Sequence, residues 1–235
     1  MNLIILYEND FLSDNVVTLS GRRFEHIINF YKPKIGQKLS VGLLNAKMGI
    51  GIVAEILSAT IKLNVELTYD PPIKLPVTLI LSLPRPKSFK KAVHAAVTLG
   101  IKEIYIIESW KVEKSFWKSP ALQEKALNEE LILALEQAKD TILPKIHFKK
   151  LFKPFIEDEI SSLDIDKKFV AHPYNSKVID GKIREESIIA IGPEGGFTEY
   201  EISKFKEVGF ETLTLGERIL RVEFAIPTFI GSLFL

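Results

Sequence analysis

The stretch IGPEGGFTEYEI, residues 191–202, holds the residue types best suited to binding a ligand. Gly192, Gly195 and Gly196 allow a ligand to approach the backbone closely, and Pro193 stiffens the turn. Glu194 adds a carboxylate, which suits a cationic or hydroxyl-bearing ligand better than a polyphosphate. A plain strand-to-helix turn is the alternative, but it rarely combines so many glycines with a carboxylate. We therefore interpret the stretch as a ligand-binding loop.

This glycine loop matches neither of the common nucleotide-binding motifs. It lacks the G-x-G-x-x-G spacing of dinucleotide-binding folds, and no lysine stands where the G-x-x-x-x-G-K-[ST] phosphate loop requires one. An enzyme that holds a nucleotide by its phosphates is therefore disfavoured.

A second stretch, LGERILRVEFA at residues 215–225, brings a hydrogen-bond donor and an acceptor close together in the sequence. Arg221 and Glu223 follow the apolar pair Ile219 and Leu220, an arrangement that a purely structural loop rarely needs. The alternative is a surface salt bridge between Arg221 and Glu223, which would contribute little to stability.

The composition excludes several classes of function. The chain has 235 residues, 46% hydrophobic and 26% charged, which suits one large or two smaller packed domains, and its net charge of +1 neither requires nor excludes nucleic acid. It has no cysteine, and its histidines lack metal-ligand spacing, so no metal is expected. MNLIILYEND does not resemble a signal peptide, and FAIPTFIGSLFL is too short to span a bilayer. We expect a cytoplasmic protein that does not associate with membranes.

Residues 1–70 predict a small β-rich domain. Short β-branched and leucine-rich runs recur, and NAKMG at 45–49 is typical of a hairpin turn. One helix is expected at 19–31, capped by Ser20, with apolar residues at helical spacing. These elements predict a small barrel. The proline-rich stretch 71–76 then predicts a stiff linker and a domain boundary.

Residues 74–235 predict an α/β domain with a mostly parallel sheet, because apolar strands alternate with helices. A capping box of Thr198 and Glu201 marks one helix start, and Gly100 and Gly209 mark helix ends. Strands are expected at 77–83, 101–109, 168–173, 187–192 and 211–216, and helices at 88–100, 121–139, 198–209 and the apolar C-terminus.

Together, IGPEGGFTEYEI and LGERILRVEFA resemble the signature of the RsmE-type 16S rRNA (uridine-N3) methyltransferases of the SPOUT superfamily. FEHIINFYKPKIGQKLSV, LILSLPRPKSFKKAVHAAVTLGIKEI and ALEQAKDTILPKI extend the resemblance over the whole chain. It implies a PUA-like β-barrel RNA-binding domain over 1–70 and a SPOUT methyltransferase domain over 74–235. The second domain would end in a deep trefoil knot and form a homodimer through it, in agreement with an apolar C-terminal helix that needs a partner.

The cofactor implied by the resemblance is S-adenosylmethionine. Residues at matching motif positions would line its pocket: His172, Pro173, Gly192, Glu194, Gly195, Gly196, Leu215, Gly216, Ile219, Leu220 and Ala225. The last strand's loop, from Leu215 to Leu220, would hold the adenine. We interpret His172 as a structural or cofactor-side residue rather than a catalytic base.

The resemblance also implies methylation at N3 of a specific uridine in 16S rRNA of the small ribosomal subunit. N3 lies on the pairing edge, so the base must be unpaired or turned out of its stack. Arg221 is expected to hold the uridine carbonyls or a phosphate, and Glu223 to remove or relay the imide proton. Phosphate contacts are expected from basic residues of both domains: Arg22, Arg23, Lys32, Arg85 and Lys87.

Several positions expected to face RNA depart from the family pattern. Asn29 and Lys32 stand where the family has arginines, Asp140 occupies another arginine position, and Phe224 replaces a threonine. Asp140 would repel phosphate, and Lys32 is not equivalent to a bidentate arginine. Two alternatives therefore remain: a SPOUT methyltransferase acting on a different RNA nucleotide, and a non-catalytic RNA-binding ribosome-assembly protein.

Overall fold

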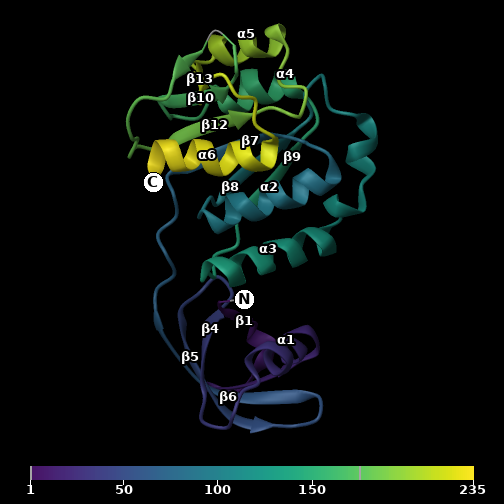
Figure 1. The fold of residues 1–235 in the computed structure, drawn as a ribbon, viewed down its shortest axis with the longest axis vertical. Helices are drawn as coiled ribbons and strands as arrows, with labels where there is room; N and C mark the ends of the chain where they lie inside the picture. Colours follow the sequence, from purple (N-terminus) through teal and green to yellow (C-terminus); the bar gives the residue numbers. More distant parts are fainter. Residues whose placement is uncertain (1, 175) are drawn as a thin grey trace. The chain divides into compact units, whose positions relative to one another are not determined.

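The computed structural model describes residues 2–174 and 176–235, which form two compact units (Figure 1). The first unit extends to Ile73 and also contains Ile132–Leu143, and the second contains Lys74–Leu131 and Pro144–Leu235. The proline-rich stretch 71–76 forms neither helix nor strand, as expected of a linker.

The first unit is a six-stranded sheet with the order β1-β4-β5-β6-β3-β2. β1 pairs with β4 in parallel, and the other neighbours are antiparallel. Alternate residues of the longer strands, such as Val17 and Leu19 of β3 and Leu63 of β6, are fully buried and form the core. The strands are β1 (Ile4–Leu6), β2 (Phe11–Ser13), β3 (Val16–Ser20), β4 (Lys38–Leu43), β5 (Met48–Ile56) and β6 (Thr60–Tyr69).

The helix of the first unit begins as α1 (Gly21–His26) and continues as a π-helical segment, Ile27–Tyr31. Ser20 occupies the N-cap position, but its side chain makes no capping hydrogen bond, so the predicted cap is wrong. The helix is held instead by burial of Ile27 in the core of the sheet.

The end of α3 (Glu124–Ala138) packs in the first unit, whereas the sequence placed the whole helix in the second domain. Glu136 is fully buried and accepts hydrogen bonds from both terminal nitrogens of Arg22, at 3.0 and 3.2 Å. Its backbone carbonyl accepts from the N–H groups of Asn2 and Leu3. A buried carboxylate requires such partners, and they join residues 132–143 to the first unit.

The second unit is a seven-stranded sheet with the order β11-β13-β10-β12-β7-β8-β9, and every pair is parallel. The expected parallel α/β architecture is therefore confirmed. The short strands β9 and β11 were not expected. The strands are β7 (Val77–Ser82), β8 (Glu103–Ile107), β9 (Lys145–Lys149), β10 (Lys167–Ala171), β11 (Lys177–Val178), β12 (Ser187–Ile191) and β13 (Glu211–Thr214).

Helices cover both faces of this sheet. Ile188 and Ala190 of β12 share a buried cluster with α5 (Glu199–Glu207) and with the π-helical segment Phe155–Ile160, which follows α4 (Phe152–Pro154). α2 (Pro86–Thr98) and α6 (Val222–Phe234) contact one another and lie side by side in Figure 1. Since β12 is buried at every position, it packs on both faces, as its continuous apolar sequence predicts.

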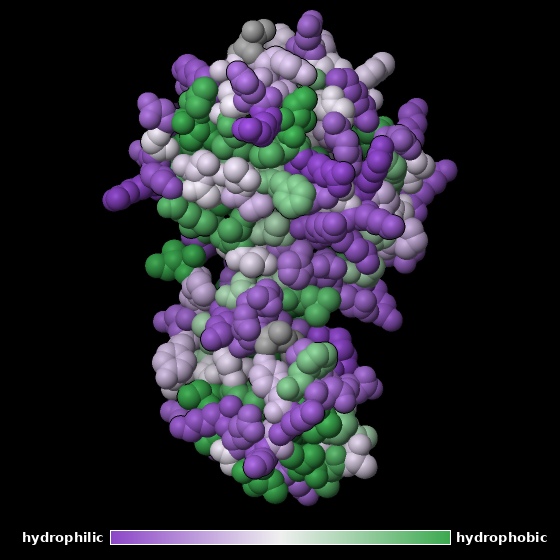
Figure 2. All heavy atoms as spheres, in the orientation of Figure 1, coloured by the Kyte–Doolittle hydropathy of each residue, from purple (hydrophilic) through white to green (hydrophobic). Residues whose placement is uncertain are grey.

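Among the described residues, no helix combines the length and apolar character needed to cross a membrane. On the face of the second unit in Figure 2, hydrophilic side chains are mixed with hydrophobic patches. This mixed surface is in keeping with the net charge of +1.

Candidate active site

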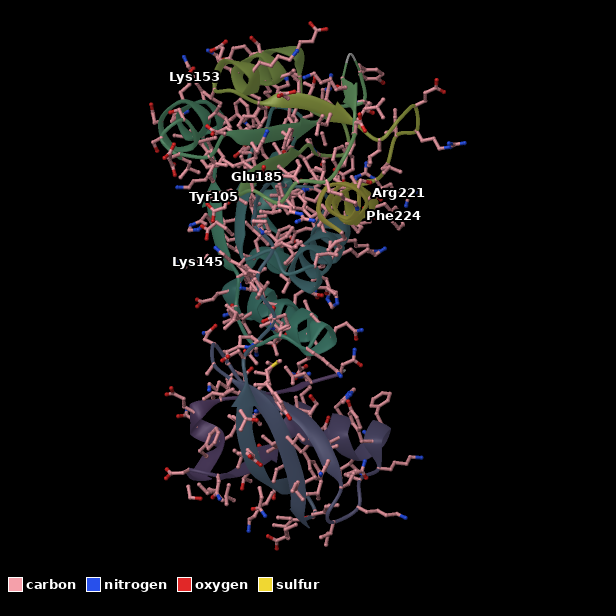
Figure 3. The ribbon with its side chains drawn as sticks, turned by 90° about the vertical axis from the view of Figure 1, so that its left-hand side faces the viewer. Tyr105, Lys145, Lys153, Glu185, Arg221 and Phe224 are labelled. Atoms are coloured by element: carbon pink, nitrogen blue, oxygen red, sulfur yellow. The ribbon has the colours of Figure 1, made fainter. Side chains whose placement is uncertain are left out.

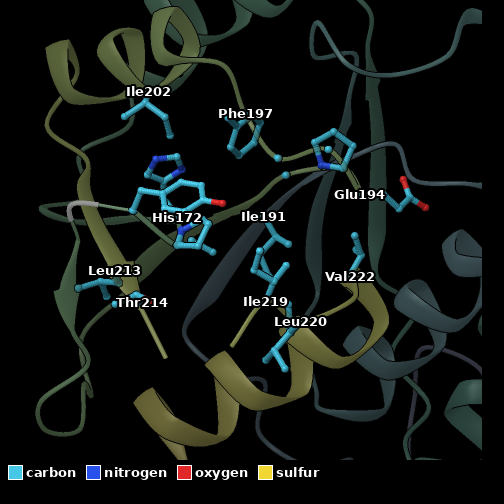
Figure 4. A pocket seen from close by; sticks show the side chains of 18 of the residues that line it. His172, Ile191, Glu194, Phe197, Ile202, Leu213, Thr214, Ile219, Leu220 and Val222 are labelled. Atoms are coloured by element: carbon cyan, nitrogen blue, oxygen red, sulfur yellow. The ribbon is translucent and has the colours of Figure 1, made fainter. Parts of the chain in front are cut away.

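Three loops of the second unit meet around a cavity of about 790 Å³ (Figure 4). They follow β10, β12 and β13, which are neighbours in the parallel sheet, so their carboxyl ends lie at one edge. This edge is where open α/β sheets bind ligands. The cavity is lined by residues 171–174, 191–199 and 213–215 with 218–220, by Ala225 of α6, and by Lys111 from the loop after β8.

The glycine loop has the tight backbone that its sequence predicts. A Cβ atom at Gly192 would lie 3.2 Å from the Gly196 Cα and 3.2 Å from the Phe197 nitrogen. Gly196 has a φ of +66°, which disfavours other residues, and its N–H donates to the Pro193 carbonyl at 2.8 Å. Gly192 and Gly196 are therefore required by the turn itself, whereas a Cβ at Gly195 would meet the Lys111 side chain, 3.0 Å from its Cδ.

Glu194 lines the cavity, yet its carboxylate points away from His172 and Ile191 in Figure 4. Its Oε1 accepts a hydrogen bond from the backbone N–H of Arg85 at 3.0 Å. Arg85 is the N-cap residue of α2, so Glu194 ties the glycine loop to the start of that helix. We expected this carboxylate to suit a cationic or hydroxyl-bearing ligand, and the geometry adds a positioning role for one of its oxygens.

The loop after β13 presents apolar side chains to the cavity. Leu215, Ile219 and Leu220 line it, and Ile219 is 71% exposed, which leaves its surface free to cover a ligand. Gly216 has a φ of +110° and donates its N–H to Thr214 Oγ1, but it is not among the lining residues. Gly216 therefore determines the conformation of the loop and does not form part of the cavity wall.

His172 and Pro173 line the cavity from the end of β10. The His172 backbone N–H donates to the Leu213 carbonyl at 3.0 Å, which joins this loop to β13. Burial lowers the pKa of His172, and the charges of Lys206 and Lys111 lower that pKa further. The imidazole is therefore neutral near pH 7.

Arg221 and Glu223 lie beside the cavity and not among its lining residues. Arg221 is the N-cap residue of α6, and its carbonyl accepts from the N–H groups of Phe224 and Ala225. Figure 3 shows Arg221 and Phe224 at the start of α6. Arg221 is exposed, so its guanidinium is accessible to a second ligand at the rim of the cavity.

The basic residues expected to contact RNA differ in how they are used. In the first unit, the Arg23 guanidinium pairs with Asp10, at 2.7 Å to Oδ1, and its side chain is only 14% exposed. Arg23 therefore stabilises the unit, and its guanidinium is occupied by the Ile5 carbonyl and Asp10 rather than available to RNA. Arg22 is half-exposed despite its pair with Glu136, and Lys32 is exposed.

Arg85 and Lys87 of the second unit are exposed at the start of α2, next to the glycine loop. Asp140, by contrast, is buried in the first unit, and its Oδ1 accepts from the Ile142 N–H at 2.9 Å. The expectation that Asp140 repels phosphate is therefore wrong, because its carboxylate completes the turn after α3.

Sequence reasoning missed three cationic residues of the cavity wall: Lys111, Lys206 and Arg218. Lys111 follows β8, and its position at a strand end was the available signal. In the part of the chain that the structure describes, no three His, Asp or Glu side chains form a group that could hold a metal ion.

Comparisons with known proteins agree with this geometry. Residues 71–233 match the family model described as an RNA methyltransferase domain. The ribosomal RNA small subunit methyltransferase E of Treponema pallidum is 29% identical over 236 residues, covering 94% of this chain and 86% of that protein. The ribosomal RNA small subunit methyltransferase E 1 of Borreliella burgdorferi is 25% identical over 233 residues, covering 96% of this chain and 94% of that protein.

The fold also matches solved structures. The ribosomal RNA small subunit methyltransferase E of Neisseria gonorrhoeae, bound to S-adenosyl methionine, superposes with a TM-score of 0.75 at 21% identity and covers 98% of this chain and 96% of that one. This likeness, with the two observed sheets, confirms the predicted fold class: an α/β domain with a parallel sheet, preceded by a smaller β-rich domain.

Proposed function

This chain belongs to the RNA methyltransferase family, and we propose that it uses S-adenosylmethionine to methylate N3 of a specific uridine in 16S rRNA of the small ribosomal subunit. The relatives that match nearly the whole chain are named for methylation of small-subunit ribosomal RNA. The observation that carries the proposal is the cavity, where the two signature stretches, 191–202 and 215–225, meet the loop of His172 and Pro173.

The residues of the cavity fit S-adenosylmethionine. A volume of about 790 Å³ is suitable for a cofactor of this size. Leu215, Ile219 and Leu220 offer an apolar surface for the adenine, and the open space beside Gly196 allows close approach, with Gly195 next to it in the cavity wall. Pro173, Gly192 and Gly216 belong to the same three loops, and Ala225 lines the cavity from α6. A neutral His172 avoids repulsion of a sulfonium.

The chemistry requires a donor and an acceptor beside the cofactor. S-adenosylmethionine supplies an electrophilic methyl group when bound. Arg221, exposed at the cavity rim, would hold the uridine carbonyls or a phosphate and orient the base. Glu223, two residues further into α6, would take or relay the N3 proton. Phosphate contacts would come from Arg22, Lys32, Arg85 and Lys87, which are exposed or half-exposed.

The assembly belongs to the same proposal. We place a PUA-like RNA-binding domain at 1–70 and the SPOUT catalytic domain at 74–235, with a trefoil knot at the C-terminal end of the latter. The chain would form a homodimer through the knotted domain in the cytoplasm. In support, Phe224 on α6 is 58% exposed although the helix is strongly apolar.

A second candidate function is methylation of a different RNA nucleotide. Asn29 and Phe224 depart from the family pattern and are both exposed, so they could change RNA contacts without changing the cofactor pocket. A non-catalytic RNA-binding role is disfavoured, because Arg221, Glu223 and the glycine loop are all present.

The test is a methyl-transfer assay with labelled S-adenosylmethionine and small ribosomal subunits from cells that lack this protein. Label at N3 of one uridine in 16S rRNA is the expected result. Label on another nucleotide would favour the second candidate. Cofactor binding without transfer to any subunit or ribosomal RNA would overturn the enzymatic proposal.

A further inference from the structure

The loop that follows β8 is attached firmly to the glycine loop and to the start of α5. Ser109, which is buried, shares a 2.6 Å hydrogen bond with buried Ser82. The Trp110 backbone N–H donates to Glu201 Oε1 at 2.7 Å, and Lys111 Nζ donates to the Gly195 carbonyl at 2.8 Å. These bonds fix residues 109–111 next to the cavity wall before any ligand arrives.

Glu201 is the centre of this attachment. It is 3% exposed, and its second oxygen, Oε2, accepts from the Thr198 N–H and hydroxyl in the capping box of α5. One buried carboxylate thus holds both the start of α5 and the backbone of Trp110. The Glu201 carboxylate therefore positions both the Trp110 backbone and the segment at which the glycine loop leads into α5.

The Trp110 indole is displayed to solvent, with 84% of the residue exposed. The chain's other tryptophan, Trp117, is half-buried, packs against Phe148 with ring centroids 6.2 Å apart, and lies 5.4 Å from the Lys150 ammonium. A large aromatic on a fixed backbone that contributes little to the core is typical of a binding surface.

Four cations lie on the segments around Trp110. Arg85, Lys87, Lys111 and Lys114 are exposed on the two segments that contact the glycine loop. Of the nearby carboxylates, Glu194 and Glu201 are engaged with the Arg85 and Trp110 N–H groups. Glu108, which is half-buried, and Glu113 and Glu199, which are exposed, lie on the same loop or at the start of α5, so this surface carries charges of both signs. Cations around an exposed indole suit a nucleic acid strand, because phosphates meet the cations while bases stack on the ring.

We infer that Trp110 is a substrate-binding residue, a stacking platform for an unpaired nucleotide of the substrate RNA at the rim of the cavity. The inference rests on the proposed function, since it places RNA at this cavity. The fixed loop holds the indole face outward, and a base stacked there would keep its neighbour at the cavity mouth. No bond is made or broken at Trp110, and its contribution is binding and orientation.

Fluorescence tests the stacking directly and without catalysis. The Trp117→Phe variant leaves Trp110 as the only tryptophan, because the chain has 2. Titration with a single-stranded oligouridylate should quench its emission in a saturable, salt-sensitive way, since base stacking and phosphate contacts are both involved. The reciprocal Trp110→Phe variant, which retains Trp117, should show no quenching. Unchanged Trp110 emission at oligonucleotide concentrations that saturate a filter-binding assay would overturn the inference.

Kinetics tests the role in the reaction. With small ribosomal subunits, Trp110→Ala should raise KM for the subunit roughly tenfold, as expected for loss of one base-stacking contact. Its Kd for S-adenosylmethionine should not change, and Trp110→Phe should restore most of the affinity. Ile73→Ala, which removes another exposed apolar side chain, is the matched control.

Three outcomes separate the hypotheses. If wild-type protein methylates subunits and Trp110→Ala does so with the same KM, the stacking role is overturned. If wild-type protein methylates nothing, the proposed function fails, and quenching of Trp110 by the oligonucleotide still decides the stacking role. If Trp110→Ala changes the mass measured by sedimentation, the indole lies in an interface between copies of the chain, and the inference is wrong.

Discussion

The Glu194 carboxylate accepts a hydrogen bond from the backbone N–H of Arg85 at 3.0 Å and so joins two loops 109 residues apart in the sequence. One loop follows β12 and carries the glycines, and the other leads from β7 into α2. Because Arg85 occupies the N-cap position, Glu194 serves as an acceptor at the start of that helix. The cavity wall is therefore held in place by contacts behind it as well as by its own turn.

We expect Glu194→Lys to weaken binding of S-adenosylmethionine by about 100-fold, because a charge-assisted hydrogen bond is replaced by a cation facing an N–H donor. Titration calorimetry measures the affinity, and circular dichroism checks that the fold is retained. Glu186→Lys, an exposed charge change in the same unit, is the control. Unchanged cofactor affinity in Glu194→Lys would contradict the placement of the pocket.

Arg221→Ala should lower kcat by about 100-fold while cofactor affinity stays within about threefold, because Arg221 lies at the rim and outside the cavity lining. The measurements are single-turnover methyl transfer and calorimetry. Arg221→Lys should recover only part of the rate, because lysine lacks the planar fork. Arg184→Ala, an exposed cation elsewhere in the unit, is the control. Equal losses of rate and of cofactor affinity would show that Arg221 binds the cofactor and not the RNA.

Glu201→Ala should reduce the free energy of unfolding by about 2 kcal/mol or more, since the buried carboxylate accepts from the N–H groups of both Thr198 and Trp110. Urea denaturation measures this change. Glu199→Ala removes an exposed carboxylate from the same helical turn and should cost no more than about 0.5 kcal/mol. Similar costs for the two variants would show that the capping box contributes little.

The pKa of His172 is lowered by burial and by Lys206 and Lys111, so the unfolded chain binds a proton at this position more readily than the folded one. The stability that follows is present above the ordinary histidine pKa, about 6.5, and is lost as the pH falls toward the lower pKa of the folded state. Urea midpoints should therefore fall between pH 7.5 and 5.5, and fall less in His172→Gln.

His26 provides a check on that result, because burial also lowers its pKa in the first unit. His172→Gln should therefore remove only part of the pH dependence, and a double variant with His26→Gln should remove more. An identical pH dependence in wild type and His172→Gln would show that the imidazole is not shifted.

Patterns confined to neighbouring residues were predictable from the sequence. The apolar run at 187–191 predicts a strand buried on both faces, and β12 is one. Thr198 and Glu201 predict a capping box, which the structure confirms with reciprocal hydrogen bonds. These signals work because a turn of helix or a strand is stabilised by residues a few positions apart. The edge strand β9 escaped prediction because KIHFK lacks a continuous apolar run.

Partnerships across long sequence separations were not predictable. We expected Arg23 to contact phosphate, but its guanidinium donates hydrogen bonds to Asp10 and to the Ile5 carbonyl. Asp140 was expected to repel phosphate, but the packing of residues 132–143 in the first unit buries it, although its acceptor role toward Ile142 is local. The partner of Arg23 and the burial of Asp140 both depend on which surfaces the fold brings together.

The sequence by itself determined five of the seven strands of the second unit, the glycine loop and the family to which the chain belongs. These features depend on the types of residues a few positions apart, which can be recognised without knowing the fold. Only the tertiary structure decided that Glu194 faces Arg85, that Arg221 stands outside the cavity wall, and that Trp110 is displayed beside it. The physical reason is that hydrogen bonding and burial of these groups are settled by packing between distant segments.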